Sequence, residues 1–499
     1  MIDAYLTALG MVFDPSVLIV ILFSAVYGLV VGAIPGLSAT MAVALLVPLT
    51  FFMPAVPAVA AIVTASSMAI FAGDIPGCLL RIPGTPASAA YVEDSYRMSL
   101  KGEPEKALGI GLVFSVIGGL FGSLVLMVAA PAIADYALKF GAVEFFWITL
   151  LGLSAAVFIG TSSPSKGFLS LLIGLIVAMI GMNNPGAVPR LTFGSPDLMA
   201  GISLIPVIVG MFAISEVLRH MISPSGSTEI IQKKIGSIFA SMWRLTKQYP
   251  WQIVRGSTLG TAIGILPGAG ADMAAWLSYA MSKRFSKEPE KFGTGHPEGL
   301  IEAGASNNSA VSGAWIPALV FGIPGDSITA IAIGVLFMKN MNPGPTIFLN
   351  SPENVYALFI VFILANLIML PLGWALIKVS AKILKAPRDL LMPIILIFSI
   401  LGSYAINNSL FDVWIMLGFG ILAFFMEENG IPLAPAILGL VLGPMIEENF
   451  VNSMIMSNGS FVGLVDRPIA AGLAVLTALI VLWPVVAAVR GRRQTVESP

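Results

Sequence analysis

Apolar runs about as long as a lipid bilayer is thick follow one another along almost the whole chain. An α-helix needs roughly 20 apolar residues to cross the hydrocarbon core, and runs close to this length begin near Val17 and recur to the C-terminal end. Hydrophobic residues make up 57% of the sequence and charged residues only 11%, whereas soluble domains carry about 25% charged residues. The chain is therefore predicted to be an all-α polytopic membrane protein.

Some of these runs are short or interrupted by proline, so they are expected to be half-spans or re-entrant helices. About 11 to 14 transmembrane segments are predicted in all. The runs lie near residues 17–34, 37–54, 58–73, 107–130, 143–160, 167–182, 198–218, 251–266, 299–322, 328–349, 355–377, 390–405, 412–426, 431–446 and 468–489.

The rest of the composition narrows the class of protein. The single cysteine, Cys78, excludes an internal disulfide, so nothing favours an extracellular scaffold. The first residues lack the basic segment and the small-residue cleavage site of a signal peptide, and the first apolar run is expected to be retained. The formal net charge of −1 favours no charged partner, and no nucleic-acid partner is expected.

An enzyme is not expected. The two histidines, His220 and His296, lie in charged loops, and the sequence has neither a Cys/His cluster for zinc nor a G-x-x-x-x-G-K-[ST] phosphate loop. Because no ATP-hydrolysing domain is present, uphill transport would have to use an ion gradient or another subunit. An intramembrane hydrolase using Asp272 and Asp326 as paired aspartates is an open alternative, although the repeat described next gives it no support.

Two segments of the chain resemble each other without a gap. Residues 66–89 align with residues 307–330 at an offset of 241, and both contain Ile-Pro and, after five intervening residues, Ile-Pro-Gly. An earlier Pro-Gly pair in GAIPGLSAT (32–40) matches the pair in GILPGAGAD (264–272) at an offset of 232. Two motifs in the same order indicate an internal duplication.

The basic residues indicate how the two copies are oriented. Lysine and arginine gather near residues 97–106, 219–255, 283–291, 378–388 and 490–493, which the positive-inside rule places in the cytoplasm. In the first copy the basic loop follows the second motif, whereas in the second copy basic loops precede the first motif and separate the two. Equivalent positions are therefore predicted to face opposite sides of the membrane, as in the inverted-topology repeats of secondary transporters. Two repeats of like orientation with an irregular charge pattern are the alternative.

Four segments follow from this repeat. Residues 1–220 are predicted to form the first membrane repeat, 221–250 a basic cytoplasmic linker, 251–450 the second, inverted repeat, and 451–499 a C-terminal transmembrane span with a basic tail.

The Pro-Gly pairs are predicted to break membrane helices. Proline removes a backbone donor and glycine permits the conformations of a broken helix, and such breaks are tolerated in hydrocarbon only when buried in protein or lining a polar cavity. A helix that restarts after a break presents unpaired N–H groups, which suit an anion such as a carboxylate. The predicted helix-break residues are Pro35, Pro83, Pro267 and Pro324.

Small and polar residues beside the breaks are the predicted substrate ligands, because backbone N–H groups, hydroxyls and amides bind oxygen-rich solutes. They are Gly36, Ser38, Thr40, Gly84, Thr85, Ser88, Gly268, Gly270, Asn307, Asn308, Gly325, Ser327 and Thr329.

Three aspartates are candidates for holding a coupling cation. Asp74, Asp272 and Asp326 lie in apolar surroundings, where an ionisable residue is a functional candidate by default. A carboxylate would repel an anionic substrate unless Na⁺ or H⁺ neutralised it, and a Na⁺ site near Asp272 or Asp326 is one possibility. The alternative is that each aspartate only caps the helix that it begins.

Long stretches of the sequence resemble one transporter family. GAIPGLSATMAVALLVPLTFFMP (32–54), GILPGAGADMAAWLSYAMSKRFSK (264–287), GTGHPEGLIEAGASNNSAVSGAWIPALVFGIPGDS (293–327) and MNPGPTIF (341–348) are similar to the large membrane subunit (TctA-type) of the bacterial tripartite tricarboxylate transporters. The resemblance extends over nearly the whole chain.

This resemblance implies a secondary importer of organic carboxylates in the bacterial inner membrane, of the tricarboxylate or dicarboxylate class. The implied partners are a small four-helix membrane subunit and a periplasmic solute-binding protein. No cofactor is implied beyond Na⁺ or H⁺ as the coupling ion. A stand-alone ion-coupled antiporter or exporter of another solute is the alternative function.

Overall fold

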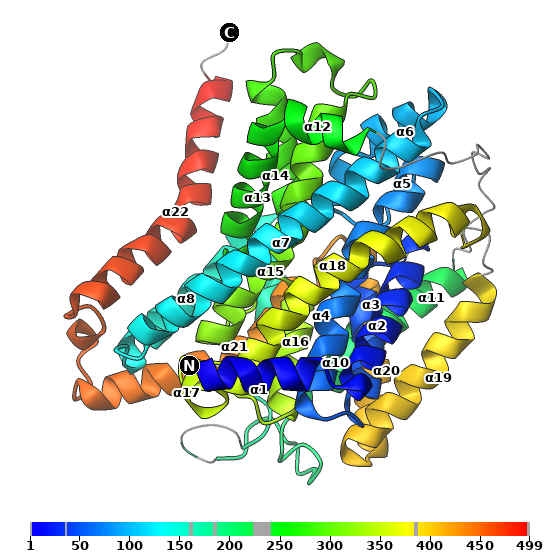
Figure 1. Ribbon diagram of the computed structural model, residues 1–499. Helices are drawn as coiled ribbons and strands as arrows, with labels where there is room; N and C mark the ends of the chain where they lie inside the picture. The colour runs from blue at the N-terminus through cyan, green and yellow to red at the C-terminus, as the bar shows by residue number, and fades with distance from the viewer. Residues whose placement is uncertain are drawn as a thin grey trace.

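The structure is a computed structural model in which almost every described residue belongs to a helix or a short connection (Figure 1). It describes residues 2–34, 37–158, 163–182, 186, 188–222, 241–383 and 388–496. These residues contain no β-strand, and a single antiparallel bridge joins Gly181 to Arg190. The predicted all-α fold is confirmed.

The first part of the chain forms helices α1 (Ile2–Val12), α2 (Pro15–Ala33), α3 (Ala39–Thr50), α4 (Ala55–Ala72), α5 (Asp74–Leu80), η1 (Ser88–Ala90), α6 (Val92–Leu100), α7 (Pro104–Ala137), α8 (Ala142–Phe158), α9 (Pro164–Ala178), α10 (Leu204–Val209), η2 (Gly210–Ile214) and α11 (Ser215–Ile222).

The second part forms α12 (Met242–Gln248), α13 (Pro250–Gly264), α14 (Gly270–Phe285), η3 (Pro289–Lys291), α15 (Pro297–Phe321), α16 (Ser327–Met338), α17 (Ile347–Asn350), α18 (Pro352–Ile383), α19 (Arg388–Asn407), α20 (Leu410–Glu428), α21 (Ala434–Met456), η4 (Phe461–Leu464) and α22 (Pro468–Val496).

Within the described residues, seven helices are long and apolar enough to cross a membrane. The multi-pass prediction is therefore confirmed, with many of the other predicted spans appearing as shorter helices. These seven are Pro15–Ala33, Ala55–Leu80, Pro104–Ala137, Leu204–Ile222, Pro352–Ser380, Leu410–Glu428 and Ala434–Met456. Predicted span 37–54, for example, is the 12-residue α3, and α14 was absent from the predicted spans because its mean hydropathy is low.

Close glycine contacts hold α2 against α4. A Cβ atom placed on Gly28 would lie 2.9 Å from the Cα of Ala65, and one placed on Gly32 would lie 2.6 Å from the Cα of Ala69. The residue numbers of both helices rise together along the contact, from Gly28 and Ala65 to Gly32 and Ala69, so α2 and α4 run parallel. Small residues four positions apart are what allow membrane helices to approach this closely.

The same contact recurs between α13 and α15. A Cβ atom on Gly260 would lie 2.7 Å from the Cα of Ser306, and one on Gly264 would lie 3.0 Å from the Cα of Ala310. These four positions are offset by 232 and 241 residues from those of the first contact, the offsets of the two predicted motifs. The duplication is therefore visible in the packing.

Along the chain, a returning helix connects the two members of each parallel pair. Since α2 and α4 run in the same direction, α3 brings the chain back between them, and α14 does so between α13 and α15. The Pro-Gly pair at 267–268 consequently lies at the tip of the helical hairpin α13–α14, and α2 and α3 form the equivalent hairpin of the first copy. Residues 35 and 36 themselves lie outside the described residues.

Two long helices show that the copies are oppositely oriented. Helix α7 follows α6 in the first copy and α18 follows α16 and α17 in the second, and the two pack side by side (Figure 1). Along this contact Gly119 faces Asn366, whereas Leu112 faces Gly373. The residue numbers of α7 fall along the contact as those of α18 rise, so these two corresponding helices are antiparallel. This agrees with the orientation that the basic loops predict. The boundaries at residues 220, 250 and 450 stay a prediction, and residues 223–240 lie outside the described residues.

A buried ion pair also joins the second hairpin to the central helix α15. Nε of Arg255 donates to Oε1 of Glu302 at 2.7 Å and Nη2 donates to Oε2 at 2.6 Å, with the Glu302 side chain fully buried. This bidentate geometry is the strongest form of an arginine–carboxylate pair.

Enlarging a glycine of the hairpin contact should destabilise the protein. We expect Gly260→Leu to cost about 1–3 kcal/mol by overpacking α13 against Ser306, seen as a lower midpoint of thermal unfolding in detergent. Gly418→Leu in α20 is the matched control, because a Cβ atom there meets nothing within 4 Å. Equal midpoints for the two variants would contradict the packing described above.

Candidate functional site

The second Pro-Gly break of the first copy turns the chain back on itself. Helix α5 ends at Leu80, and the next residue, Arg81, adopts a left-handed conformation with φ of 61°. The N–H of Ile82 donates to the carbonyl of Pro76 at 3.4 Å. The N–H of Gly84 then donates to the carbonyl of Gly73 at 3.1 Å, at the start of α5. Residues 82–91 therefore form a re-entrant segment, with Gly84 pressed against the helix it has just left.

The second copy repeats this turn at equivalent positions. Helix α15 ends at Phe321 and is followed by Gly322, which has a φ of 69°. The N–H of Ile323 donates to the carbonyl of Pro317 at 3.2 Å. Gly325 returns against Ala314, where an added Cβ atom would lie 2.8 Å from the Ala314 Cα. Every one of these residues is offset by 241 from its counterpart. The predicted helix breaks at Pro83 and Pro324 thus have one common geometry.

Reciprocal caps stabilise the residues that follow each break. The N–H of Thr85 donates to Ser88 Oγ at 3.2 Å and the N–H of Ser88 donates to Thr85 Oγ1 at 3.1 Å. At the equivalent positions, the N–H of Thr329 donates to Asp326 Oδ1 at 2.8 Å and the N–H of Asp326 donates to Thr329 Oγ1 at 2.9 Å, a capping box for α16. These four predicted site residues therefore have a structural role in holding the breaks.

The tip of the second hairpin meets the second break of its own copy. The N–H of Gly268 donates to the carbonyl of Gly325 at 2.8 Å. Gly268 and Gly270 have φ of 79° and 54°, and a Cβ atom on Gly270 would lie 2.6 Å from the Cβ of Asp326. Only glycine combines these conformations with so close an approach, which explains the sequence PGAG at this tip.

Asp272 links the same tip to the first copy. It is the third residue of α14, yet no side chain caps this helix. Its Oδ1 instead accepts from the N–H of Ala87, 185 residues away, at 3.1 Å, and one turn later Trp276 Nε1 donates to the carbonyl of Pro86 at 3.1 Å. The alternative, in which Asp272 only caps its own helix, is therefore not seen, and its carboxylate instead joins the two copies.

The side chain of Asp272 is exposed, and so are Pro86 and Trp276 beside it. Asp326 and Ser327 are partly exposed, whereas Thr85 and Ser88 are buried. Part of the meeting point of the breaks, around Asp272, is therefore exposed at the surface of the protein.

The tip of the first hairpin is described only beyond the break. Ser38 caps α3, its Oγ accepting from the N–H of Met41 at 3.1 Å, and Thr40 is the second residue of that helix. The predicted site residues Pro35 and Gly36 lie outside the described residues. Helix α3 packs against α16 of the other copy, as α14 packs against η1.

The two adjacent asparagines lie in the middle of α15, fully buried and away from any break. Asn307 Nδ2 donates to the hydroxyl of Tyr91 at 3.4 Å, and Asn308 Nδ2 approaches the sulfur of Met369 in α18 at 3.5 Å. The structure thus directs Asn307 toward the first re-entrant segment and Asn308 away from it.

Asp74 joins Asn307 through the same hydroxyl. The Tyr91 hydroxyl donates to Asp74 Oδ1 at 2.6 Å, and the other carboxylate oxygen has no hydrogen-bond partner among the described residues. Sequence reasoning did not select Tyr91, although its position three residues beyond Ser88 was a usable signal.

A buried carboxylate that sequence reasoning missed ties the copies together near the basic loops. Asp94 Oδ2 accepts from the hydroxyl of Tyr279 at 2.6 Å, while Oδ1 accepts from the N–H groups of Gly295 and His296 at 2.7 and 3.0 Å. Its place in a charged helix, VEDSYR, gave no signal, because its partners come from residues 279–296.

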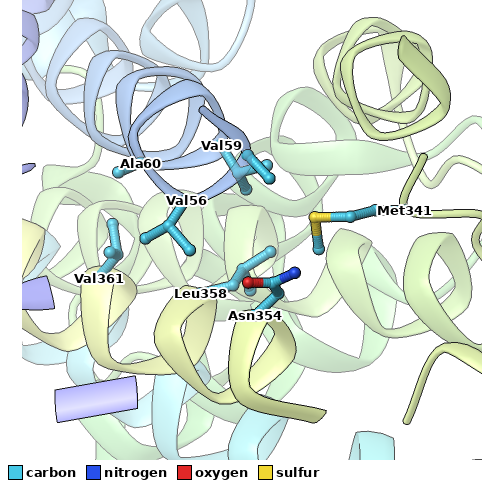
Figure 2. Close-up of a pocket in the computed structure, with 8 residues that line it drawn as sticks. Val56, Val59, Ala60, Met341, Asn354, Leu358 and Val361 are labelled. Carbon is cyan, nitrogen blue, oxygen red and sulfur yellow. The ribbon is translucent and has the colours of Figure 1, made fainter. Parts of the chain in front are cut away.

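Two pockets elsewhere in the molecule do not suit an anion. One lies between α4 and α18 and is lined by aliphatic residues and Met341, with Asn354 as its polar side chain (Figure 2). The other, with a volume of about 310 Å³, lies among α9, α16 and α21 and is lined by apolar residues and Gly201. No predicted site residue lines either pocket.

The charges at the breaks are negative. Asp272 and Asp326 lie close enough to repel each other electrostatically, and neither they nor Asp74 form an ion pair with a described basic residue. The described residues hold no group of three or more His, Cys, Asp or Glu side chains suited to a metal ion. The predicted Na⁺ site near Asp272 or Asp326 stays a prediction.

Two substitutions of Asp326 separate its cap from its charge. Asp326→Ala should cost about 0.5–2 kcal/mol by removing the N-cap of α16, whereas Asp326→Asn should keep the cap, since asparagine is an equally good N-cap residue. The midpoint of thermal unfolding in detergent measures both. If the asparagine variant proved as unstable as the alanine variant, the charge rather than the cap would be holding the break.

Comparisons with known proteins place the chain in a family. Residues 18–438 match the family described as "Tripartite tricarboxylate transporter TctA family". A protein of Agrobacterium vitis, "Uncharacterized 52.8 kDa protein in TAR-I ttuC' 3'region", is 32% identical over 469 residues, covering 94% of this chain and 93% of the relative. Another from that organism, "Uncharacterized protein in TAR-II ttuC' 3'region", is 35% identical over 237 residues, covering 48% of this chain and 98% of the relative. No solved structure is significantly similar. The chain belongs to the tripartite tricarboxylate transporter TctA family.

Proposed function

We propose that this chain is the large subunit of a tripartite, ion-coupled importer of organic carboxylates in the bacterial inner membrane. Membership of the TctA family supports transport rather than catalysis. The observation that carries the proposal is the meeting of three helix breaks, through the bonds from Gly268 to Gly325 and from Ala87 to Asp272.

A substrate carboxylate would bind at the N-terminus of α14. No side chain caps this 16-residue helix, so its first N–H groups are available to an anion, and the helix dipole adds positive potential there. Gly268 and Gly270 carry no side chain that would cover these groups. Ser327, partly exposed at the start of α16, supplies a hydroxyl beside the same tip.

The two carboxylates at this tip would oppose an anion and thereby require a cation. With Asp272 and Asp326 both ionised, bringing in a substrate carboxylate adds a third negative charge in a membrane interior, where charges interact strongly. Co-binding of Na⁺ or H⁺ at one of the three candidate aspartates would remove this repulsion. Substrate and ion would then move together, which is the basis of symport.

The opposed orientation of the copies supplies two routes to the site. The hairpins α2–α3 and α13–α14 enter from opposite sides, since corresponding helices are antiparallel. Alternating access in inverted repeats arises when one such part moves against another around a fixed site.

The proposed partners are a small four-helix membrane subunit and a periplasmic solute-binding protein. The word "tripartite" in the family description supports an assembly of three components. The binding protein would deliver the carboxylate to the side opposite the basic loops.

Uptake by reconstituted protein tests the whole proposal. Proteoliposomes containing the two membrane subunits should take up a labelled tricarboxylate or dicarboxylate only when the binding protein and an ion gradient are supplied, and should ignore a neutral solute of similar size. Full-rate uptake by this chain alone would instead favour a stand-alone transporter. Cleavage of a peptide without any uptake would favour the intramembrane hydrolase.

A methyl group at the hairpin tip should block transport. Gly270→Ala would press on Asp326 and strain a residue with φ of 54°, and we expect uptake to fall on the order of tenfold to a hundredfold, because small misplacements of a site have large effects. Gly472→Ala in α22, where an added Cβ atom meets nothing within 4 Å, is the control. Unimpaired uptake by the Gly270 variant would place the substrate elsewhere.

A further inference from the structure

The three candidate aspartates differ in how well their oxygens are satisfied. Asp326 caps α16 through Thr329, and Asp272 accepts from Ala87 on an exposed face. Asp74 is only 6% exposed, and its Oδ2 has no hydrogen-bond partner among the described residues. A buried carboxylate with neither a cation nor a full set of donors is costly to keep ionised. Of the three, Asp74 is therefore the carboxylate with an oxygen left to bind a further ligand.

The space around this oxygen admits a proton better than a metal ion. Gly111 of α7 lies directly against it, since a Cβ atom placed there would be 2.8 Å from Oδ2. The Tyr91 hydroxyl already donates to the other carboxylate oxygen, Oδ1, and accepts from Asn307. A hard cation needs a shell of several oxygen ligands, whereas a proton needs only the one free oxygen.

Asp74 is also placed to affect the break. The preceding residue, Gly73, accepts the N–H of Gly84 and lies against the side chain of Thr85. At the other end of the re-entrant segment, Tyr91 bonds to Asp74 itself. The segment 82–91 is therefore hydrogen-bonded to the start of α5 at both ends, through Gly84 and through Tyr91. The charge of Asp74 directly affects the bond from Tyr91.

The link continues into the second copy. Asn307 of α15 donates to the Tyr91 hydroxyl, and its own Oδ1 is buried with no hydrogen-bond partner in the described part of the chain. Asp74 is thus connected to the central helix of the other repeat through one hydroxyl.

No charged group of the surrounding helices offsets Asp74. Helices α2 and α4 contain no charged residue. The titratable groups that face Asp74 are the phenol of Tyr91 and, one turn along α5, the thiol of Cys78. The charged groups of α6 and α7 have partners elsewhere or act on Cys78: Glu93 with Arg81 and Arg97, Asp94 with Tyr279, Lys106 with Glu103, and Glu105 toward Cys78.

We propose that Asp74 carries the coupling proton of the transport cycle. The proton adds to the free oxygen of the ionised carboxylate and later leaves it for water on the side to which the site opens, and no other bond forms or breaks. The ionised carboxylate holds the Tyr91 hydroxyl, and with it the re-entrant segment, closed on α5, and protonation weakens this bond. This inference rests on the proposed function as an ion-coupled carboxylate transporter.

Two assays on the reconstituted complex separate this inference from the proposed function. The first is exchange of labelled for unlabelled organic acid without any gradient, and the second is uptake driven by a pH gradient, alkaline inside, at zero membrane potential. Asp74→Asn imitates the protonated carboxyl. We expect it to keep exchange and to lose the stimulation by the pH gradient completely.

Asp412→Asn is the matched control. Asp412 is likewise buried, at 4% exposure, and accepts from Asn407 Nδ2 at 2.6 Å, but it lies in α20, away from the breaks. This variant should keep the stimulation of the wild-type protein.

The outcomes are distinguishable. A wild-type response to the pH gradient in Asp74→Asn would overturn the inference, as would stimulation of the wild-type complex by a Na⁺ gradient alone. Absence of exchange in the wild-type complex would count against the proposed function instead. If Asp74→Asn lost exchange as well, Tyr91→Phe would decide: the pH of half-maximal uptake should move upward, because the hydroxyl that stabilises the carboxylate is gone, and an unchanged pH profile would overturn the inference.

Discussion

Backbone N–H and C=O groups inside a membrane must be satisfied by the protein itself, and the structure of this chain depends on how its broken helices meet that requirement. Each re-entrant segment bonds back to the helix that it leaves, at Ile82 to Pro76 and Ile323 to Pro317. A reciprocal side-chain cap then serves the residues after the break. Other backbone groups at the breaks are satisfied by hydrogen bonds between segments, as where the N–H of Gly268 donates to the carbonyl of Gly325. The breaks are thus possible only because they lie together.

Close helix packing is the second condition for this arrangement. The first helix of each hairpin, α2 or α13, lies almost in backbone contact with a buried helix, α4 or α15 respectively. Gly28 and Gly32 provide that contact in the first copy, and Gly260 and Gly264 provide it in the second. The glycines therefore position the breaks from a distance, while the prolines only open the helices.

Much of this arrangement could be predicted from local sequence, and the remainder could not. The four Pro-Gly pairs, the offset of 241 residues and the opposed orientation are all properties of short motifs and of basic loops. The partner of Asp272 and the direction of Asn308 depend instead on contacts across 185 and 61 residues, which no single-sequence pattern encodes. Tyr91 was missed for another reason: an aromatic residue is usually only part of the core, so its position three residues beyond Ser88 was not used.

The bond between Ala87 and Asp272 has a consequence for how the protein is made. Residues 82–91 emerge from the ribosome long before the second hairpin exists, so the first re-entrant segment must wait in the membrane, or at its surface, for a partner nearly two hundred residues downstream. Contacts of such high sequence separation form late in folding. The first half of the chain is thus inserted in an unfinished state, and the transport pathway closes only when synthesis of the second half is well advanced.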